Sequence, residues 1–482
     1  MDATNNVGIV IVGAAGDRGA AALEILPKLR AEESTQGINL ELVCLAEAKE
    51  DFHADLHSRA AALLDSRCPV VGMLVEGIPH MLRWLANGHD QRKLIVYDAT
   101  PTAHHYLHLM AVLPRTERER VYYFGEKPLF TNQGQIEFIE RNFAGQTFFC
   151  DLIETENPAF RATNEFIRKE RFNIQKMFFW RASCMGVSIA AGDGRGGVEG
   201  GALLDKAPHD LSVAVGLLGP RNLMQSSVSQ VRAHLLALHE SAFQQSSRSF
   251  LSVANGPLED LSSPVKLQEN WPAVALASFD VDFTLPGNVA VPVSFIASWL
   301  GIQNTHLELS LCDKLASLGI EVNEWLNSES SRTSRNQRYR YGNQEVRVAL
   351  IEGLLSGRKV HLVLNFLSKF EGRRFVYLLG EGRQRKVIFE EENVASYHEK
   401  KDADLLRIFQ RVVEDCAGLG AAENINAEVT LLVHKIMLSA AMKANEQLRT
   451  IDQDQACKAS LNAYRKYLAP VNGSHSSPLK LD

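Results

Sequence analysis

A lysine and an aspartate–histidine pair are the residues of this sequence whose types and spacing suit proton transfer. Asp205 and His209 stand four residues apart, so on a helix that continues through Pro208 they share one face, where the carboxylate orients the imidazole and stabilises its charged form. Lys127 follows a strand at its carboxyl end, the edge where open α/β sheets bind ligands, and a desolvated lysine there donates a hydrogen bond to a hydroxyl or carbonyl oxygen. A surface ion pair and an ordinary loop lysine are the alternatives. Side chains of these types at this spacing suit acid–base chemistry on a small substrate, with these alternatives left open.

A glycine-rich turn follows the apolar run 7–12 and opens a helical stretch. Gly13 permits a tight turn, the small residue after it lets the backbone approach a phosphate, and N–H groups at a helix start favour an anion. The spacing is G-x-x-G-x-x-G rather than the commoner G-x-G-x-x-G, and an ordinary strand-to-helix turn is the alternative. Its position favours a nicotinamide dinucleotide, with its pyrophosphate contacted by Gly13, Ala15, Gly16, Asp17, Arg18 and Gly19.

An acidic side chain follows the second apolar run. Glu47 comes just after residues 40–45, where a carboxylate can accept hydrogen bonds from the hydroxyls of the adenosine ribose. This favours NAD, whereas the nearby Lys49 could tolerate a 2′-phosphate, so NADP is not excluded. A surface glutamate is the alternative.

The composition restricts the partners of the chain. Its 482 residues, 45% of them hydrophobic and 22% charged, suit a folded protein of two domains. A net charge of −6 argues against nucleic acid, which requires a basic surface. The 7 cysteines lack metal-ligand spacing, so we expect reduced thiols and no metal site. We find neither a secretory signal nor an apolar run long enough for a membrane, and expect a cytoplasmic protein.

The first 150 residues alternate between short apolar runs and helical stretches. This pattern predicts repeated βα units on a parallel sheet, a doubly wound Rossmann domain over residues 1–150. The expected strands are 7–12, 39–45, 70–75, 93–98, 120–124 and 147–153.

After residue 150 the pattern changes to long alternating runs, typical of a large, mostly antiparallel open sheet. We expect an α+β substrate and oligomerisation domain over residues 151–468, with insertions near 241–264 and 327–345, and a flexible tail over 469–482. The expected strands are 174–183, 227–238, 274–284, 291–299, 306–312, 346–351, 359–366, 374–380 and 386–390, and the expected helices are 159–170, 202–218 and 427–446.

Three motifs in this order resemble the glucose-fructose oxidoreductase / inositol dehydrogenase (Gfo/Idh/MocA) family. Thr100-Pro101-Thr102 follows the fourth strand, Gly125-Glu126-Lys127-Pro128-Leu129 closes the fifth, and the glycine-led segment 200–210 contains the Asp205/His209 pair. The sheet-rich second half also suits that family's substrate domain.

The resemblance implies a fold, a reaction and roles. His209 would take the proton from a hydroxyl of a sugar, cyclitol or aminosugar while hydride passes to the nicotinamide, Lys127 would polarise the oxygen, and Asp205 would hold His209. It also implies that His105 packs its helix. Further cofactor contacts would come from Thr100, Pro101, Glu126, Lys127 and Pro128.

Two departures from that family concern the substrate. Ala207 and Pro208 replace the common D-x-G-x-H pattern, and Pro208 could kink the start of the helix and displace His209. The arginine that many members carry before Pro158 is missing. Asn157 and Arg195 are the candidate substrate contacts, and a solvated loop residue is the alternative for Arg195.

These features favour a net oxidation or reduction at a secondary alcohol or ketone carbon. A redox-neutral enzyme, in which NAD oxidises one carbon transiently for epimerisation, elimination or glycoside cleavage, is one alternative. A ligand-sensing regulator on the same fold is another, although such a protein should lose Lys127 or His209, and both are present here. We also expect a homo-oligomer.

Overall fold

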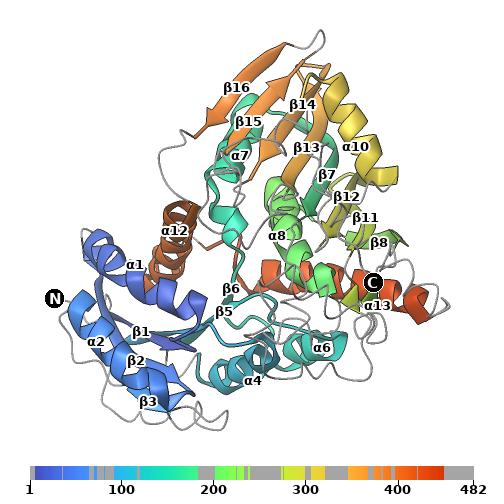
Figure 1. Cartoon of the computed structure of the whole chain (residues 1–482). Helices are drawn as coiled ribbons and strands as arrows, with labels where there is room; N and C mark the ends of the chain where they lie inside the picture. The colour runs from blue at the N-terminus through green and yellow to red at the C-terminus, as the bar shows by residue number, and fades with distance from the viewer. Residues whose placement is uncertain are drawn as a thin grey trace, which may run out of the picture. The chain divides into compact units, whose positions relative to one another are not determined.

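A computed structural model of the chain defines two compact units. Unit 1 comprises residues 1–157 and 398–435, and unit 2 comprises residues 158–397 and 436–482 (Figure 1). No helix among the described residues has the length and apolar character to cross a membrane. The structure describes residues 6–34, 36–64, 70–72, 81, 92–116, 120–182, 201–223, 225–232, 237–238, 273–274, 276–298, 306–320, 346–366, 374–380, 384–391, 397–420 and 422–449.

Unit 1 is built on a parallel six-stranded sheet in the order β3-β2-β1-β4-β5-β6. The chain order reverses between β1 and β4, and at such a switch point the carboxyl ends of the strands leave a crevice for a ligand. Its strands are β1 (Asn6–Val12), β2 (Asn39–Glu47), β3 (Val70–Gly72), β4 (Lys93–Asp98), β5 (Val121–Glu126) and β6 (Phe148–Asp151).

Helices follow the strands, as a doubly wound sheet requires, because parallel neighbours need crossover connections. They are α1 (Asp17–Ser34), α2 (His53–Leu64), α4 (Thr102–Val112) and α6 (Gln133–Asn142), with the short η2 (Glu50–Phe52) before α2. Their apolar sides and the strands between them form the core of the unit.

The segment 398–435 was expected in the second domain but belongs to unit 1. It contains most of α12 (Tyr397–Ala417), a helix that we did not predict, and the start of α13 (Ala427–Arg449). The physical reason is aromatic packing: the ring centroid of Phe409 lies 4.7 Å from that of Tyr97 and 5.0 Å from that of Phe124. Burying these rings joins α12 to the sheet.

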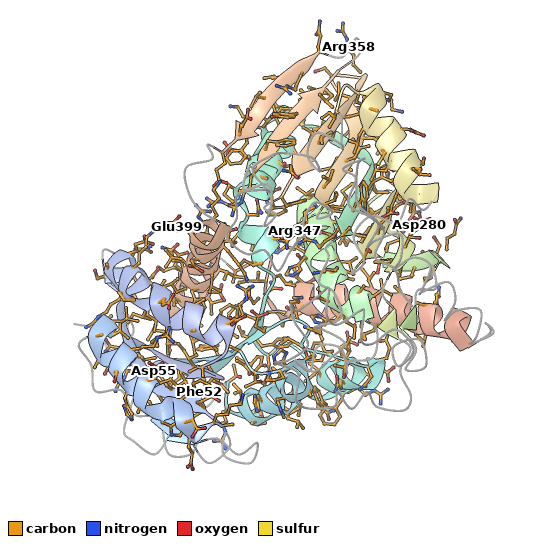
Figure 2. All side chains as sticks on the ribbon, in the orientation of Figure 1. Phe52, Asp55, Asp280, Arg347, Arg358 and Glu399 are labelled. Atoms are coloured by element: carbon orange, nitrogen blue, oxygen red, sulfur yellow. The ribbon has the colours of Figure 1, made fainter. Side chains whose placement is uncertain are left out.

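Unit 2 contains an eight-stranded sheet in the order β16-β15-β14-β13-β7-β12-β11-β8. Every pair is antiparallel except β7 with β12, which confirms the mostly antiparallel sheet. Arg358 marks the turn between β13 and β14 in Figure 2. The strands are β7 (Asn173–Ala182), β8 (Gln225–Arg232), β11 (Leu276–Leu285), β12 (Val289–Ser298), β13 (Val346–Leu355), β14 (Arg358–Asn365), β15 (Phe375–Leu379) and β16 (Arg385–Glu390), with a separate pair β9 (Ala237–Leu238) and β10 (Ala273–Val274).

Helices cover both faces of this sheet. Successive side chains of a strand point to opposite faces: Trp180 of β7 packs in a cluster with Leu311 and Leu315 of α10 (His306–Ser317), whereas Arg181 pairs with Asp210 of α8 (Gly201–Leu218). Therefore α8 and α10 lie on opposite faces. The helix α7 (Pro158–Glu170) contacts α8 and strands β14 to β16.

One expected strand is wrong. Residues 306–312 begin α10 rather than a strand. Apolar and polar residues alternate there, but Leu307, Leu311 and Leu315 also recur every four residues. These three leucines share one face of the helix and pack in or against the core cluster. The expected insertions and the tail lie outside the described residues.

Candidate active site

Two glycines determine the shape of the turn after β1. Gly13 has a φ of +74° and its N–H donates to the carbonyl of Ala46 at 2.8 Å. A Cβ on Gly19 would stand 2.3 Å from the carbonyl oxygen of Gly13 and 2.7 Å from Cα of Ala14, so only glycine lets α1 pack this closely. At Gly16 a Cβ would meet nothing nearer than 3.5 Å. The turn thus leaves space beside Gly16 at the start of an 18-residue helix, which fits a phosphate.

Glu47 lies against this turn at the end of β2. Its Oε2 accepts from the backbone N–H of Ala15 at 3.0 Å and its Oε1 from that of Lys49 at 3.1 Å, and the residue is 8% exposed. The Lys49 ammonium stands 5.8 Å from the ring centroid of Phe52, which is labelled in Figure 2. A carboxylate is therefore fixed where a Rossmann domain places the ribose of its dinucleotide.

Arg18 pairs with a residue that we also expected to contact the cofactor. Its Nε lies 2.5 Å from Oε1 of Glu126, at the end of β5, and its terminal nitrogen 3.6 Å from Oδ2 of Asp151, at the end of β6. The ion pair links the first turn of α1 to β5, the strand that Lys127 follows. Asp17 opens α1, where its charge is favourable.

The carboxyls of Glu126 and Asp151 share this buried edge. Burial, opposed by Arg18 and reinforced by the Glu126 charge, raises the pKa of Asp151 to about 7. Burial also opposes ionisation of Glu126, but Arg18 and Lys127 hold its pKa below the ordinary value. Burial therefore favours the protonated form of Asp151, whereas the neighbouring cations favour the ionised form of Glu126.

The loop after β4 is held by Asp98. Its Oδ1 accepts from the Thr100 backbone N–H at 3.0 Å and from the Thr100 hydroxyl at 2.6 Å, and its Oδ2 accepts from the Tyr123 hydroxyl at 2.8 Å. His108 Nδ1 lies 2.8 Å from the same Oδ2. Burial alone would raise the pKa of Asp98, but the hydrogen bond from His108 and the charges of His105 and His108 hold it below the ordinary value. Thr100 is thus positioned through its own hydroxyl.

Lys127 follows β5 directly and is partly exposed. The peptide between Lys127 and Pro128 is cis. The imidazole of His105 lies between the two loops, with Nδ1 2.9 Å from the carbonyl oxygen of Pro128 and Nε2 2.7 Å from that of Thr100. His105 therefore connects the loop of Thr100 and Pro101 to that of Lys127.

In unit 2, α8 carries the predicted acid–base pair. The helix runs without a break from Gly201 to Leu218 with Pro208 in its interior, so Pro208 does not end it. Asp205 and His209 are therefore one helical turn apart, and both are partly exposed. An Asp205 carboxylate oxygen lies 3.0 Å from the Lys206 ammonium. Asp210, the next residue after His209, pairs with the buried Arg181 guanidinium at 2.8 Å and fixes this turn on β7.

Of the two predicted substrate contacts, the structure describes only Asn157. Asn157 is 1% exposed and its amide donates to Glu154 Oε2 at 2.9 Å, while Arg195 lies outside the described residues. Unit 1 thus brings Gly13, Ala15 and Glu47 together, and Arg18 together with Glu126. Asp98 and Asp151 were missed, although each is a polar residue at the end of a strand, the same signal that identified Glu47.

No protein-family model matches the chain, and no curated protein matches it. Several solved structures match the chain. An oxidoreductase domain protein from Kribbella flavida is 13% identical with a TM-score of 0.55, covering 92% of this chain and 98% of its own. A levoglucosan dehydrogenase in complex with NADH and levoglucosan is 13% identical with a TM-score of 0.53, covering 91% and 98%. An aldose-aldose oxidoreductase from Caulobacter crescentus is 10% identical with a TM-score of 0.51, covering 92% and 97%. Over nearly its whole length, this chain therefore shares the fold of solved oxidoreductases.

Proposed function

We propose that this chain is a nicotinamide-dependent oxidoreductase acting on a secondary alcohol or ketone carbon of a sugar, cyclitol or aminosugar. The observation that carries the proposal is the Glu47 carboxylate bound to the Ala15 N–H of the glycine turn. It supplies a ribose acceptor beside a phosphate cradle, and Lys127 leaves the same sheet at its ligand-binding edge. The sugar dehydrogenase and the aldose oxidoreductase with this fold support the substrate class.

NAD is the proposed form of the cofactor. Glu47 is nearly buried and both of its oxygens accept backbone hydrogen bonds, so its carboxylate stays in place. A 2′-phosphate in that position would meet this negative charge. When bound, the nicotinamide accepts or returns the hydride.

Three side chains, His209, Lys127 and Asp205, carry out the proton transfer and hydrogen bonding of the proposed reaction. In the oxidation, the carbon–hydrogen bond breaks with its electron pair leaving as hydride, and the hydroxyl proton passes to the imidazole of His209. Lys127 donates a hydrogen bond to the oxygen as the carbonyl forms, and Asp205 stabilises the imidazolium. Lys127 belongs to unit 1 and the other two to unit 2, so their joint action is part of the proposal.

The test begins with the purified full-length chain. Released nucleotide is identified by mass spectrometry, the dissociation constants of NAD and NADP are measured, and polyols are screened for NADH by absorbance. Net NADH formation supports the proposal. Product formed with bound NAD but without net NADH would replace it with the redox-neutral alternative, and ligand binding without turnover would favour a regulator.

Lys127→Ala and His209→Asn should each lower kcat by about 100- to 10,000-fold while NAD still binds, because each removes one proton-transfer or hydrogen-bonding group. Lys28→Gln, at an exposed lysine of α1, is the control and should keep the activity. Full activity of the Lys127 or His209 variant would refute the assigned role.

A further inference from the structure

The peptide unit between Pro128 and Leu129 has both of its polar groups held by histidines. Its carbonyl oxygen lies 2.9 Å from Nδ1 of His105 on α4, and its N–H donates to Nε2 of His434 on α13 at 2.9 Å. This peptide is the second after Lys127. Two helices far apart in the sequence thus fix the backbone that follows the lysine.

The hydrogen bonds of His434 determine its tautomer. Nδ1 lies 2.7 Å from the carbonyl oxygen of Thr430, which can only accept, so Nδ1 carries the proton. Nε2 is then left with a lone pair for the Leu129 N–H. Burial lowers the pKa of His434 to about 4, against the opposing effect of Thr430, which keeps the ring neutral at pH 7.

The imidazole of His434 is also fixed by packing. It is 0% exposed, and the ring of Phe130 meets it edge to face at a centroid distance of 5.2 Å. The helix that carries it is anchored nearby, since the amide of Gln133 donates to the carbonyl of Lys435 at 3.5 Å. Because the imidazole is held in place, its Nε2 determines the position of the Leu129 N–H. A mobile acceptor would instead adjust to the position of that N–H.

We propose that His434 is a positioning residue for Lys127, acting through its hydrogen bond to the Leu129 backbone. The inference rests on the catalytic role proposed for Lys127. His434 touches the backbone two residues beyond the lysine, so losing its acceptor moves the lysine relative to a bound oxygen rather than removing the lysine. Small displacements of a catalytic group reduce turnover more than cofactor binding.

Two amides test this, because each reproduces one half of the imidazole. His434→Gln places an oxygen near the position of Nε2 and can still accept from Leu129. His434→Asn keeps a donor near the position of Nδ1, for Thr430, but is too short to reach Leu129. Lys435→Gln changes the next residue of α13, whose ammonium pairs with Glu140 at an exposed site, and is the matched control.

The asparagine variant should lower kcat by 10- to 100-fold, with KM and the NAD dissociation constant changed less than threefold. The glutamine variant should recover kcat to within threefold of the wild type, and the control should match the wild type. Equal losses in both amide variants, or full activity of His434→Asn, would overturn the proposal. If His434→Asn does not fold, His434→Gln must still retain kcat, and a large loss there has the same meaning.

A readout without turnover separates this inference from the proposed function. The acetylation rate of Lys127 by an N-hydroxysuccinimide ester, followed by peptide mass spectrometry, reports the surroundings of its amine. It should change in His434→Asn and return in His434→Gln, with Lys28 as the internal reference. Inactivity of the wild-type chain would refute the proposed function, whereas an unchanged acetylation rate in His434→Asn would refute the positioning role.

Discussion

At the scale of single residues, Gly19 determines how closely α1 approaches the turn that follows β1. The space for its side chain is already occupied by backbone, which cannot move without displacing the turn. Gly16 belongs to the same motif, yet a Cβ there would make ordinary van der Waals contacts. We therefore expect substitution by alanine to change the stability differently at Gly19 and at Gly16.

Gly19→Ala should lower the free energy of unfolding by about 1–3 kcal/mol, the range of substitutions that overpack a buried site. Gly16→Ala should change it by less than about 1 kcal/mol, whatever its effect on nucleotide binding. Urea denaturation followed by circular dichroism measures both variants. Equal stability of the two would mean that the close packing of α1 on the turn does not contribute.

At the scale of elements, the contact between α1 and α12 contains a buried carboxyl. Glu33 of α1 is 0% exposed, and within the described residues neither of its carboxylate oxygens has a hydrogen-bond partner. Burial, together with the charges of Glu414 on α12 and of Glu32, raises its pKa to about 7. The folded state therefore prefers the protonated form.

The pKa of Glu33 leads to a pH-dependent stability. Glu33 has a pKa of about 7 in the folded state and 4.5 as its ordinary value, which we take for the unfolded state. The free energy by which the protonated carboxyl favours folding is therefore complete below pH 4.5 and is lost as the pH rises through 7. Glu33→Gln copies the protonated form and should be more stable than the wild type at pH 8 by about 1–3 kcal/mol, but equally stable at pH 4. Thermal or urea unfolding at both pH values measures the difference.

The control for this prediction is Glu24→Gln, which changes an exposed glutamate of the same helix. Its effect should stay within about 0.5 kcal/mol at both pH values. A stability difference for Glu33→Gln that does not grow with pH would show that Glu33 is ionised in the folded state.

Local periodicity identified most elements, because strands and helices repeat their apolar residues differently. It failed at residues 306–312, where the leucines satisfy both periods and only the core of unit 2 selects the helix. The site residues also divide into those that a local sequence pattern identifies and those that only the folded unit brings into place. Glu47 and Glu126 end strands and Lys127 follows one, so all three could be found locally. His434, in contrast, lies 305 residues from Leu129 and has no local signal.

At the scale of the molecule, unit 1 is discontinuous. The first 157 residues contain its whole sheet, but residues 398–435 belong to the same unit and contribute to its core. Phe409 covers Tyr97 and Phe124, the carbonyl of Ile425 accepts from the N–H of Cys150 on β6, and His434 holds the loop of Lys127. Unit 1 therefore depends on a segment that follows most of unit 2 in the chain.

A chain ending at residue 397 should consequently lose NAD binding, although every predicted cofactor contact precedes residue 130. Removing α12 exposes two core aromatic rings, and removing α13 leaves the Leu129 N–H unpaired, so unit 1 should fold incompletely or aggregate. Calorimetric titration with NAD and near-ultraviolet circular dichroism test this, with a chain ending at residue 468 as the control that should bind like the full chain. NAD binding by the shorter chain with unchanged affinity would show that residues 1–157 form a complete cofactor domain and that segment 398–435 only covers it.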